Sequence, residues 1–492
     1  MLNMAVRNSK KLIREKSASD NIRIGRFFTK RETARLMADT FRPVERSAVY
    51  VLDPGAGTGI LSAAAVEAIC KMGRASEIFL TCYENDPMFV PMLANNLERI
   101  RRRARHDYHV KLRVDIKEEN FLLASHPVDT RYDYIIINPP SEPCPNTREE
   151  AQRYGDIVAS ATVDTACLFV RAASDLLAPD GQMATVLPLS VATGVSLSRF
   201  RQRLFAVAQV EKICLFAKDK EGTPLKNQLV LALRAGSGTD KDLTITVSTD
   251  DGTPEKTAAL PAQPYGQIVD PADGSLLLVK SEEELALLSF MRRLPCTLDT
   301  FHLRVHTGLA LESRYPELLR DKPVDGAVPL IHPRSLRGGI VQFPLSGLKN
   351  QYIIPSIPSL CQPNKNMLLM KRVPAKSDKR RLVCAAYLAG SMTNKYISTH
   401  NKLNYIDVDG NAQMDPAFLF GLLAFLSSEL VDSYIRIISK SGQVNATELA
   451  SLPLPTANQL RTVGQKLMAI RIYKPEYCDR VVKAELLRTP QK

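Results

Sequence analysis

The sequence predicts an α/β fold with a doubly wound, mainly parallel sheet, followed by a C-terminal mixed α/β domain. Three observations predict it. Short apolar runs alternate with amphipathic segments from about residue 48 to residue 235, which is typical of a parallel sheet with helices on both faces. A glycine-rich loop, residues 53–59, joins the first apolar run to a helical pattern. Near residue 235 Gly, Thr, Asp, Ser and Pro become frequent, which marks the end of this Rossmann-like region.

The predicted elements follow in chain order. Residues 21–41 carry Arg26-Phe27-Phe28-Thr29-Lys30 and then apolar residues at helical spacing, which predicts an approach loop and an amphipathic helix that begins near Thr29. Apolar runs predict strands at 49–52, 78–83, within 110–122, and at 132–137, 183–187, 210–216 and 229–233. Amphipathic patterns predict helices at 60–71, 87–105, 164–177, 197–208 and 281–293.

The chain length predicts more than one domain. A chain of 492 residues exceeds what one hydrophobic core usually organises. We expect a catalytic domain at 1–235, a connector at 236–290 and a recognition domain at 291–492.

Composition narrows the class of protein. The net charge of +13 favours a polyanionic partner. Nine cysteines without a Cys-x-x-Cys pair, and seven histidines without ligand spacing, predict reduced thiols and no metal site. There is no apolar run of membrane-spanning length and no signal-peptide pattern, so we expect a cytoplasmic protein without a membrane partner.

The glycine loop predicts a nucleotide cofactor site. In Asp53-Pro54-Gly55-Ala56-Gly57-Thr58-Gly59, glycines permit positive φ and a close approach of the backbone to a ligand. The helix that follows offers free N–H groups to a carboxylate such as that of methionine. Glu84 ends the next strand, where its carboxylate can accept both ribose hydroxyls. Asn120 and Phe121 follow the third strand and could contact an adenine ring, although Asn120 is equally typical of a turn.

A second polar segment, Asn138-Pro139-Pro140, ends the fourth predicted strand. The Asn138 side-chain oxygen and the Pro139 carbonyl can accept the two hydrogens of a ring amine, which frees the nitrogen lone pair for a sulfonium methyl group. With the glycine loop, this predicts an S-adenosylmethionine-dependent methyltransferase that acts on a nucleic-acid base. Such a base must leave its duplex. Phe216 is a candidate stacking face for it, and ordinary core packing explains Phe216 equally well.

These segments resemble the N6-adenine DNA methyltransferases of the gamma arrangement. Arg26-Phe27-Phe28-Thr29 is similar to the family's opening motif, with Lys30 in place of its proline. Residues 53–59 resemble the cofactor motif, Glu84 the ribose acid and Asn138-Pro139-Pro140-Ser141 the catalytic motif. The resemblance implies that Phe28, Thr29, Asp53, Gly55, Gly57, Gly59, Glu84, Asn120 and Phe121 bind the cofactor.

The C-terminal part resembles the Eco57I-type and BsuBI/PstI-type modification enzymes of type II restriction–modification systems. Lys371, Arg372, Arg380 and Arg381 are candidate phosphate ligands in the recognition domain. In the segment 443–449, Gln443, Asn445 and Thr447 could read base edges or phosphates, and the last two could equally cap a helix. The resemblance implies double-stranded DNA as the partner, a monomer, and a cognate restriction endonuclease encoded nearby.

One position departs from the family pattern, and it leaves alternatives open. Ser141 stands where the family has an aromatic residue, which removes a stacking contribution of about 1–3 kcal/mol. The chain could therefore be a weak or silent DNA-binding paralogue. Other Asn-Pro-Pro enzymes act on RNA or on protein glutamine, and cytosine N4 presents a similar amine. Cys144 invites a cytosine-C5 mechanism, but no Glu-Asn-Val follows it.

Overall fold

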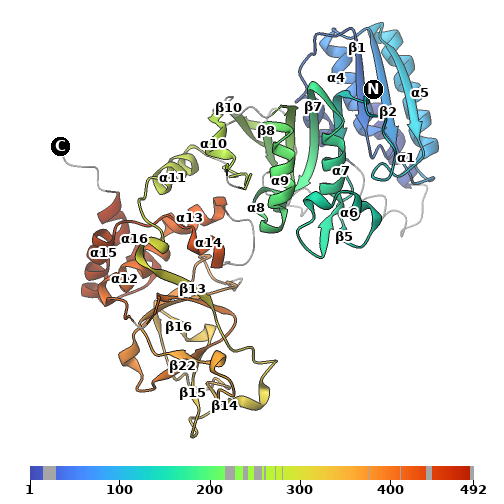
Figure 1. Cartoon of the computed structure of the whole chain (residues 1–492). Helices are drawn as coiled ribbons and strands as arrows, with labels where there is room; N and C mark the ends of the chain where they lie inside the picture. Colours follow the sequence, from blue (N-terminus) through green and yellow to red (C-terminus); the bar gives the residue numbers. More distant parts are fainter. Residues whose placement is uncertain are drawn as a thin grey trace, which may run out of the picture. The chain divides into compact units, whose positions relative to one another are not determined.

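In a computed structural model the chain forms two compact units, Met1–Lys280 and Ser281–Lys492 (Figure 1). The structure describes every residue except 15–28, 217–227, 237–241, 249–256, 260–261, 272, 280, 376, 411, 439–445 and 488–492. The unit boundary lies within the range predicted as a connector. Residues 236–280 of that range therefore belong to the first unit, and residues 281–290 belong to the second.

The first unit is built on one large sheet. Its strands are β1 (Ala48–Asp53), β2 (Glu77–Tyr83), β3 (Lys111–Lys117), β4 (Tyr132–Ile137), β7 (Leu177–Pro188), β8 (Ala208–Phe216), β9 (Gln228–Ala235), β10 (Asp242–Ser248), β11 (Thr257–Ala259) and β12 (Gln263–Pro264). The order is β11-β10-β8-β9-β7-β4-β1-β2-β3, and β12 pairs with β10. Strands β3, β2, β1, β4 and β7 are parallel, whereas β9 runs antiparallel to β7 and β8. The prediction of a mainly parallel sheet is confirmed.

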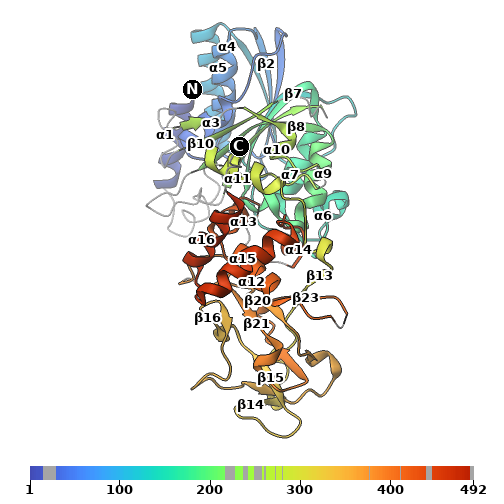
Figure 2. The ribbon, with the colours of Figure 1, turned by 90° about the vertical axis from the view of Figure 1, so that its left-hand side faces the viewer.

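Helices cover both faces of this sheet. They are α1 (Leu2–Arg14), α3 (Arg31–Ala38), α4 (Ile60–Met72), α5 (Val90–Tyr108), α6 (Glu149–Arg153), α7 (Thr165–Ser174), α8 (Ser190–Thr193), α9 (Ser198–Phe205) and α10 (Tyr265–Ile268). Figure 2 shows α4 and α5 on one side of the sheet and α7 and α9 on the other. One apolar core joins α1, α3, α4 and α5 to the strands beneath them. A doubly wound sheet results.

Several elements of the first unit have no counterpart in the predicted order, among them helix α1 and a short hairpin. Helix α1 packs behind the glycine loop, where the Ser9 hydroxyl lies 2.7 Å from Thr58 Oγ1. Met1, which precedes α1, is tied to α4, because its amine lies 2.6 Å from the Glu67 carboxylate. A short antiparallel hairpin of β5 (Pro143–Pro145) and β6 (Thr162–Asp164) follows the Asn-Pro-Pro turn. Strands β5 and β6 have three residues each and are too short to stand out in the sequence, whereas the 13-residue amphipathic pattern of α1 could have indicated a helix.

The segment predicted as a connector, 236–290, extends the first unit over most of its described length. β10 pairs with β8 in parallel, and β11 and β12 pair with β10. Gly, Asp and Pro in this segment are poor strand formers, but β10 itself carries Thr, Ile and Val, which favour strands. The sheet edge supplies the hydrogen bonds that stabilise it. The second unit begins with α11 (Glu282–Arg292), which Ser281 caps at the N–H of Glu284.

The second unit combines two smaller sheets with a helical layer. Its strands are β13 (Leu303–Thr307), β14 (Leu319–Arg320), β15 (Val328–Ile331), β16 (Leu336–Arg337), β17 (Ile340–Val341), β18 (Tyr352–Ile353), β19 (Gln362–Pro363), β20 (Met367–Lys371), β21 (Cys384–Tyr387), β22 (Tyr396–Thr399) and β23 (Leu403–Val408). They form the sheets β13-β23-β20-β21-β17-β16 and β14-β18-β15-β22-β19. The helices after them are α12 (Pro416–Leu426), α13 (Glu429–Ile438), α14 (Ala446–Ala450), α15 (Ala457–Ile470) and α16 (Pro475–Leu486).

Helices α12 and α15 approach each other very closely. A Cβ atom at Gly421 would lie 1.9 Å from the Leu460 carbonyl oxygen, and one at Gly464 would lie 1.8 Å from that of Ala417. Only glycine fits at these two positions. Among the described residues no single helix is long and apolar enough to cross a membrane, although α12 and α13 together reach that length across a bend of 58°.

Candidate active site

The glycine loop lies between the end of β1 and the start of α4. Gly57 and Gly59 have φ of 53° and 83°, the left-handed region that favours glycine. A Cβ at Gly59 would lie 3.0 Å from Leu93 Cδ1, whereas one at Gly57 would meet nothing within 4 Å. The loop therefore needs glycine for its conformation, and at Gly57 it exposes bare backbone.

The Asn-Pro-Pro turn follows β4, which pairs in parallel with β1. Parallel neighbours end at the same edge of a sheet, so the turn and the glycine loop are adjacent. Both line one cavity of about 390 Å³, to which Pro54, Gly55, Gly57, Asn138 and Pro140 contribute. This volume is in the range of small-molecule sites. The structure thus brings together the two segments on which the functional prediction depends.

Asn138 is partly buried and held by a residue far away in the sequence. Its Nδ2 donates a hydrogen bond of 2.9 Å to Thr29 Oγ1. With the donor end occupied, the side-chain oxygen remains an acceptor, and it forms no hydrogen bond within the described part of the chain. Thr29 is buried and contacts the catalytic candidate, and its role in cofactor binding stays a prediction.

Glu84 lines the cavity at the end of β2. Its Oε2 accepts the Gly57 N–H and its Oε1 accepts the Asp86 N–H, each over 2.8 Å. These bonds tie the carboxylate to the glycine loop. Burial raises the pKa of Glu84 above its ordinary value. The predicted ribose ligand therefore also shapes the loop.

Asn120 and Phe121 also line the cavity, beyond the end of β3. The Asn120 side-chain oxygen accepts the Leu122 N–H over 3.0 Å, so Asn120 does act as a turn residue. Its amide nitrogen donates to Glu150 Oε1 over 3.2 Å. Phe121 is buried, with its ring 5.7 Å from that of Phe169 at an interplanar angle of 30°. A flat ligand ring would find aromatic and amide groups at this end of the cavity.

Sequence reasoning missed several cavity residues. Phe169 lies on α7, and Tyr83 precedes Glu84. Arg148 and Glu150 come from the region of α6 and form an ion pair of 3.0 Å. These aromatic residues look like ordinary core positions in the sequence, and only the fold shows that they border a cavity.

Ser141 lies at the outer end of the Asn-Pro-Pro turn and is exposed. Its hydroxyl donates to Asp164 Oδ2 over 2.8 Å, while Asp164 Oδ1 caps α7 at the Ala166 N–H. The Pro140 carbonyl accepts the Thr165 hydroxyl over 2.8 Å. These hydrogen bonds anchor the turn to the residues at the start of α7.

Some predicted residues cannot be placed. Phe28, Gln443 and Asn445 lie outside the described residues. Phe216 ends β8 and Thr447 lies in α14, but only their backbone is described. Cofactor binding by Phe28, base stacking by Phe216 and DNA contact by Gln443, Asn445 and Thr447 stay predictions.

Asp53 is fully buried at the end of β1, where its Oδ2 accepts the Ser62 hydroxyl over 2.6 Å. Burial raises the pKa of Asp53 to about 7. An unfolded chain titrates this group near pH 3.9, so the folded state binds the extra proton between about pH 4 and pH 7. The contribution of Asp53 to stability is therefore present below this window and is lost as pH rises through it.

Replacing Asp53 with asparagine is expected to remove this pH dependence. Asparagine keeps an oxygen for the Ser62 hydroxyl but carries no charge. We expect equal stability near pH 4 and a more stable variant at pH 8, by on the order of 4 kcal/mol. Urea unfolding at the two pH values measures the difference. The control is Asp129→Asn, in an exposed turn. If the free energy of unfolding of Asp53→Asn changed with pH as much as that of the wild type, the raised pKa of Asp53 would be contradicted.

Two of the four predicted phosphate ligands of the second unit pair closely with carboxylates. Lys371 Nζ lies 3.0 Å from Asp378 Oδ2, and Arg380 Nη2 lies 2.6 Å from Asp479 Oδ2. Arg372 and Arg381 are half-buried. Because Lys371 and Arg380 already have carboxylate partners, binding a phosphate would require them to exchange one anion for another. Their role in DNA binding stays a prediction.

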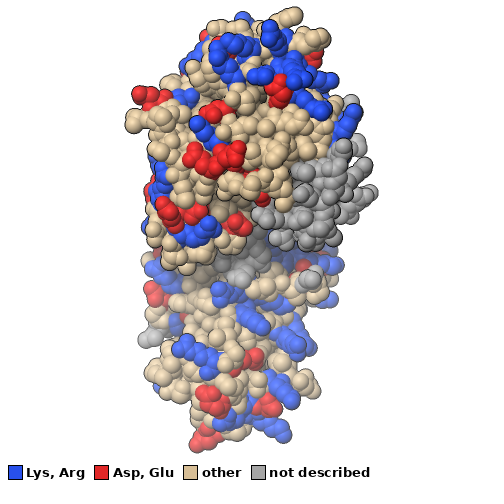
Figure 3. All heavy atoms as spheres, turned by 90° about the vertical axis from the view of Figure 1, so that its right-hand side faces the viewer, with Lys and Arg blue, Asp and Glu red and all other residues tan. Residues whose placement is uncertain are grey.

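The positive charge of the chain nevertheless gathers in the second unit. Residues 281–492 contain 28 Lys and Arg against 18 Asp and Glu, most of the net charge of +13. Figure 3 shows many of these basic side chains on one face of that unit. This excess of positive charge favours the binding of a polyanion, and it does not depend on whether Lys371 and Arg380 contact phosphates.

Replacing Arg380 with alanine is expected to destabilise the second unit. Less than a fifth of the Arg380 and Asp479 side chains is exposed, and Asp479 also accepts the Glu429 N–H over 2.6 Å. Losing Arg380 leaves that carboxylate without its counter-charge and should lower the free energy of unfolding by about 1–3 kcal/mol. Thermal unfolding measures this. The control is Lys379→Ala, at an exposed neighbouring position, which should have little effect on Tm. Equal Tm values for the two variants would contradict a stabilising role of the Arg380–Asp479 pair.

Known proteins resemble this chain over most of its length. Residues 11–232 match the family described as N-6 DNA Methylase. The chain is 29% identical over 465 residues to the type II methyltransferase M.PstI of Providencia stuartii, covering 90% of this chain and 89% of the relative. It is 26% identical over 466 residues to the type II methyltransferase M.BsuBI of Bacillus subtilis, with the same coverage.

Among solved structures, the type IIL restriction–modification enzyme MmeI in complex with DNA matches with a TM-score of 0.51. The two are 10% identical, and the match covers 100% of this chain and 75% of the other. That likeness concerns the fold. Residues 11–232 thus match the N-6 DNA Methylase family, and the chain as a whole is similar to two type II methyltransferases.

Proposed function

We propose that this protein transfers a methyl group from S-adenosylmethionine to N6 of an adenine extruded from duplex DNA, as the modification enzyme of a type II restriction–modification system. The observation that carries the proposal is the single cavity shared by the glycine loop and the Asn-Pro-Pro turn. Two relatives that are named type II methyltransferases support it across both units of the chain.

The cavity residues fit this cofactor. Bare backbone at Gly55 and Gly57 leaves room for the methionine part, and the Glu84 carboxylate can accept ribose hydroxyls. Phe121 and Phe169 offer apolar faces to an adenine ring. When bound, S-adenosylmethionine supplies a methyl group on a positively charged sulfur.

Asn138 is the residue that would contact the adenine amine. Thr29 holds its amide nitrogen, so the side-chain oxygen is left to accept one hydrogen of the adenine amine. The Pro139 carbonyl can accept the other, because neither proline supplies a competing N–H donor. Two acceptors placed in advance pull the nitrogen out of conjugation and stabilise the charge that develops on it. No covalent enzyme intermediate is needed.

The second unit would bind the duplex and select the sequence. Its excess of Lys and Arg supplies attraction to phosphates, and base contacts supply specificity. We include in the proposal that the enzyme acts as a cytoplasmic monomer and that a cognate restriction endonuclease is encoded nearby. The similarity to two type II methyltransferases over 90% of this chain supports the restriction–modification setting.

Mass spectrometry of nucleosides tests the reaction. Duplex DNA is incubated with the full chain and S-adenosylmethionine, digested and analysed. We expect N6-methyladenine to appear, confined to one short sequence motif. N4-methylcytosine would change the target base. Binding of DNA without any methylated product would favour the silent DNA-binding alternative, which Ser141 in place of an aromatic residue prompts.

A further inference from the structure

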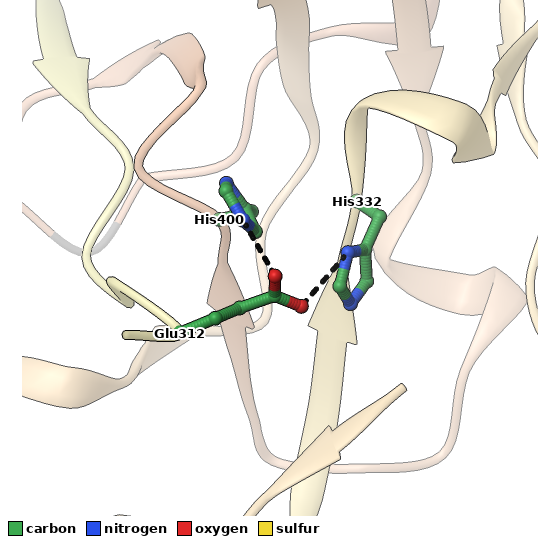
Figure 4. Close-up of side chains that lie close together, drawn as sticks. All are labelled: Glu312, His332 and His400. Atoms are coloured by element: carbon green, nitrogen blue, oxygen red, sulfur yellow. Dashed lines mark ion pairs between the residues drawn. The ribbon is translucent and has the colours of Figure 1, made fainter. Parts of the chain in front are cut away.

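Three side chains that could ligate a metal converge in the second unit. Glu312, His332 and His400 each offer one ligand atom, and these atoms lie within 4.8 Å of one another. Glu312 Oε1 lies 3.7 Å from His332 Nδ1, and Glu312 Oε2 lies 3.5 Å from His400 Nε2. Figure 4 shows the carboxylate between the two imidazole rings.

The backbone explains why these residues meet. β15 and β22 are parallel, with Ile331 opposite Thr399, so the residues that follow them, His332 and His400, are neighbours. Ala310 forms a parallel bridge with His400, which places the segment leading to Glu312 beside them. Backbone pairing thus holds the three segments side by side.

The two histidines of this cluster are buried beside a carboxylate. His332 and His400 are 6% and 4% exposed, and their ring centroids lie 5.3 Å apart. His332 Nε2 lies 2.8 Å from the Asn350 carbonyl oxygen. That oxygen can only accept, so Nε2 carries a proton and, in the neutral ring, Nδ1 presents a lone pair. This lone pair faces the Glu312 carboxylate. Two electron-rich groups so placed repel each other unless a cation lies between them.

We propose that Glu312, His332 and His400 bind a divalent transition-metal ion, and that Zn²⁺ suits them best. Two imidazoles and one carboxylate form a common zinc ligand set, in which a water takes the fourth position. The Asn350 carbonyl is the outer partner that orients a metal-bound histidine. Glu312 is only half-buried, which leaves an entry path. The ion would join three segments of the second unit and stabilise them.

Binding requires one proton to move. His400 Nδ1 accepts the Lys402 N–H over 3.0 Å, so in the metal-free ring the proton is on Nε2, facing Glu312. A metal at Nε2 displaces that proton to Nδ1 and breaks the hydrogen bond from Lys402. The coordination bond replaces the hydrogen bond, and the net charge of the ring does not change.

Zinc titration of the full chain, first freed of metal with a chelator, tests the proposal. We expect calorimetry to show one Zn²⁺ per chain and thermal unfolding to show a higher Tm with zinc. Affinity should fall at least about tenfold in Glu312→Gln and in His332→Ala. His306→Ala is the matched control, because His306 also pairs with a carboxylate, Asp407 at 3.1 Å, but is nearly half exposed and outside the cluster.

Cobalt(II) in place of zinc identifies the ligands. Nitrogen and oxygen ligands give d–d bands without a thiolate charge-transfer band, which separates this cluster from the nine cysteines of the chain. No binding by the wild type, binding that survives Glu312→Gln, or a thiolate band would overturn the proposal. In the first case a protonated His332 that pairs with Glu312 would be the better explanation. Glu312→Gln keeps the side-chain shape, so it remains decisive even if His332→Ala fails to fold.

Discussion

Methyl transfer is expected to fall at least about 100-fold when Asn138 is replaced with alanine. The side-chain oxygen of Asn138 is the acceptor that would draw on the adenine amine, and alanine supplies none. Its amide nitrogen is held by Thr29 at 2.9 Å, so the oxygen is oriented before substrate arrives. Transfer of a radiolabelled methyl group to duplex DNA, at saturating S-adenosylmethionine, measures the loss.

The control for this variant is Asn146→Ala. Asn146 is exposed and lies just beyond β5, in the same stretch of chain, so the same substitution there should leave activity near the wild-type value. The affinity of Asn138→Ala for S-adenosylmethionine should also stay within about threefold, because the glycine loop and Glu84 are untouched. Wild-type turnover in Asn138→Ala would remove Asn138 from the mechanism. If the affinity for S-adenosylmethionine fell as much as methyl transfer, Asn138 would instead be a cofactor ligand.

The first unit was the more predictable part of the molecule. Central parallel strands are buried on both faces and appear in the sequence as continuous apolar runs, as in the fully buried β4. The glycine loop then fixes the order of strand, loop and helix. Because parallel strands end at a common edge, Asp53, Glu84 and Asn138 could be expected near one another from the sequence alone.

Contacts between distant segments could not be predicted in this way. Phe169 is one of several apolar residues on α7, and nothing in its spacing shows that it borders the cavity. In the second unit, a run of basic residues indicates charge but not its partner: Arg380 meets Asp479 on α16, about a hundred residues later. Short strands such as β16 and β17 carry too few residues for a detectable period.

The histidine cluster shows the same limit most clearly. A metal site was not expected, because His332 and His400 have no short ligand spacing in the sequence. Their proximity depends on one register, Ile331 opposite Thr399. A shift of one residue in that pairing would move one histidine to the opposite face of the sheet. Only the folded chain carries this information.

Replacing Glu84 with glutamine is expected to weaken S-adenosylmethionine binding about 10- to 100-fold. Both carboxylate oxygens already accept a backbone N–H, from Gly57 and from Asp86. Glutamine has one acceptor, so its NH₂ group must face one of these donors, and the ribose loses a charged partner. Calorimetric titration with the cofactor measures the change.

Two further observations distinguish this effect from a general loss of folding. Turnover at saturating cofactor should stay within a few-fold of the wild type, because Asn138 is unaffected. Since burial raises the pKa of Glu84, wild-type affinity should decline as pH falls through that raised value, where the carboxylate is protonated and stops accepting. The glutamine variant should lack this decline. Glu118→Gln, at an exposed site after β3, should match the wild type at every pH. A Glu84→Gln variant that keeps its cofactor affinity but loses turnover would place Glu84 with the substrate instead of the ribose.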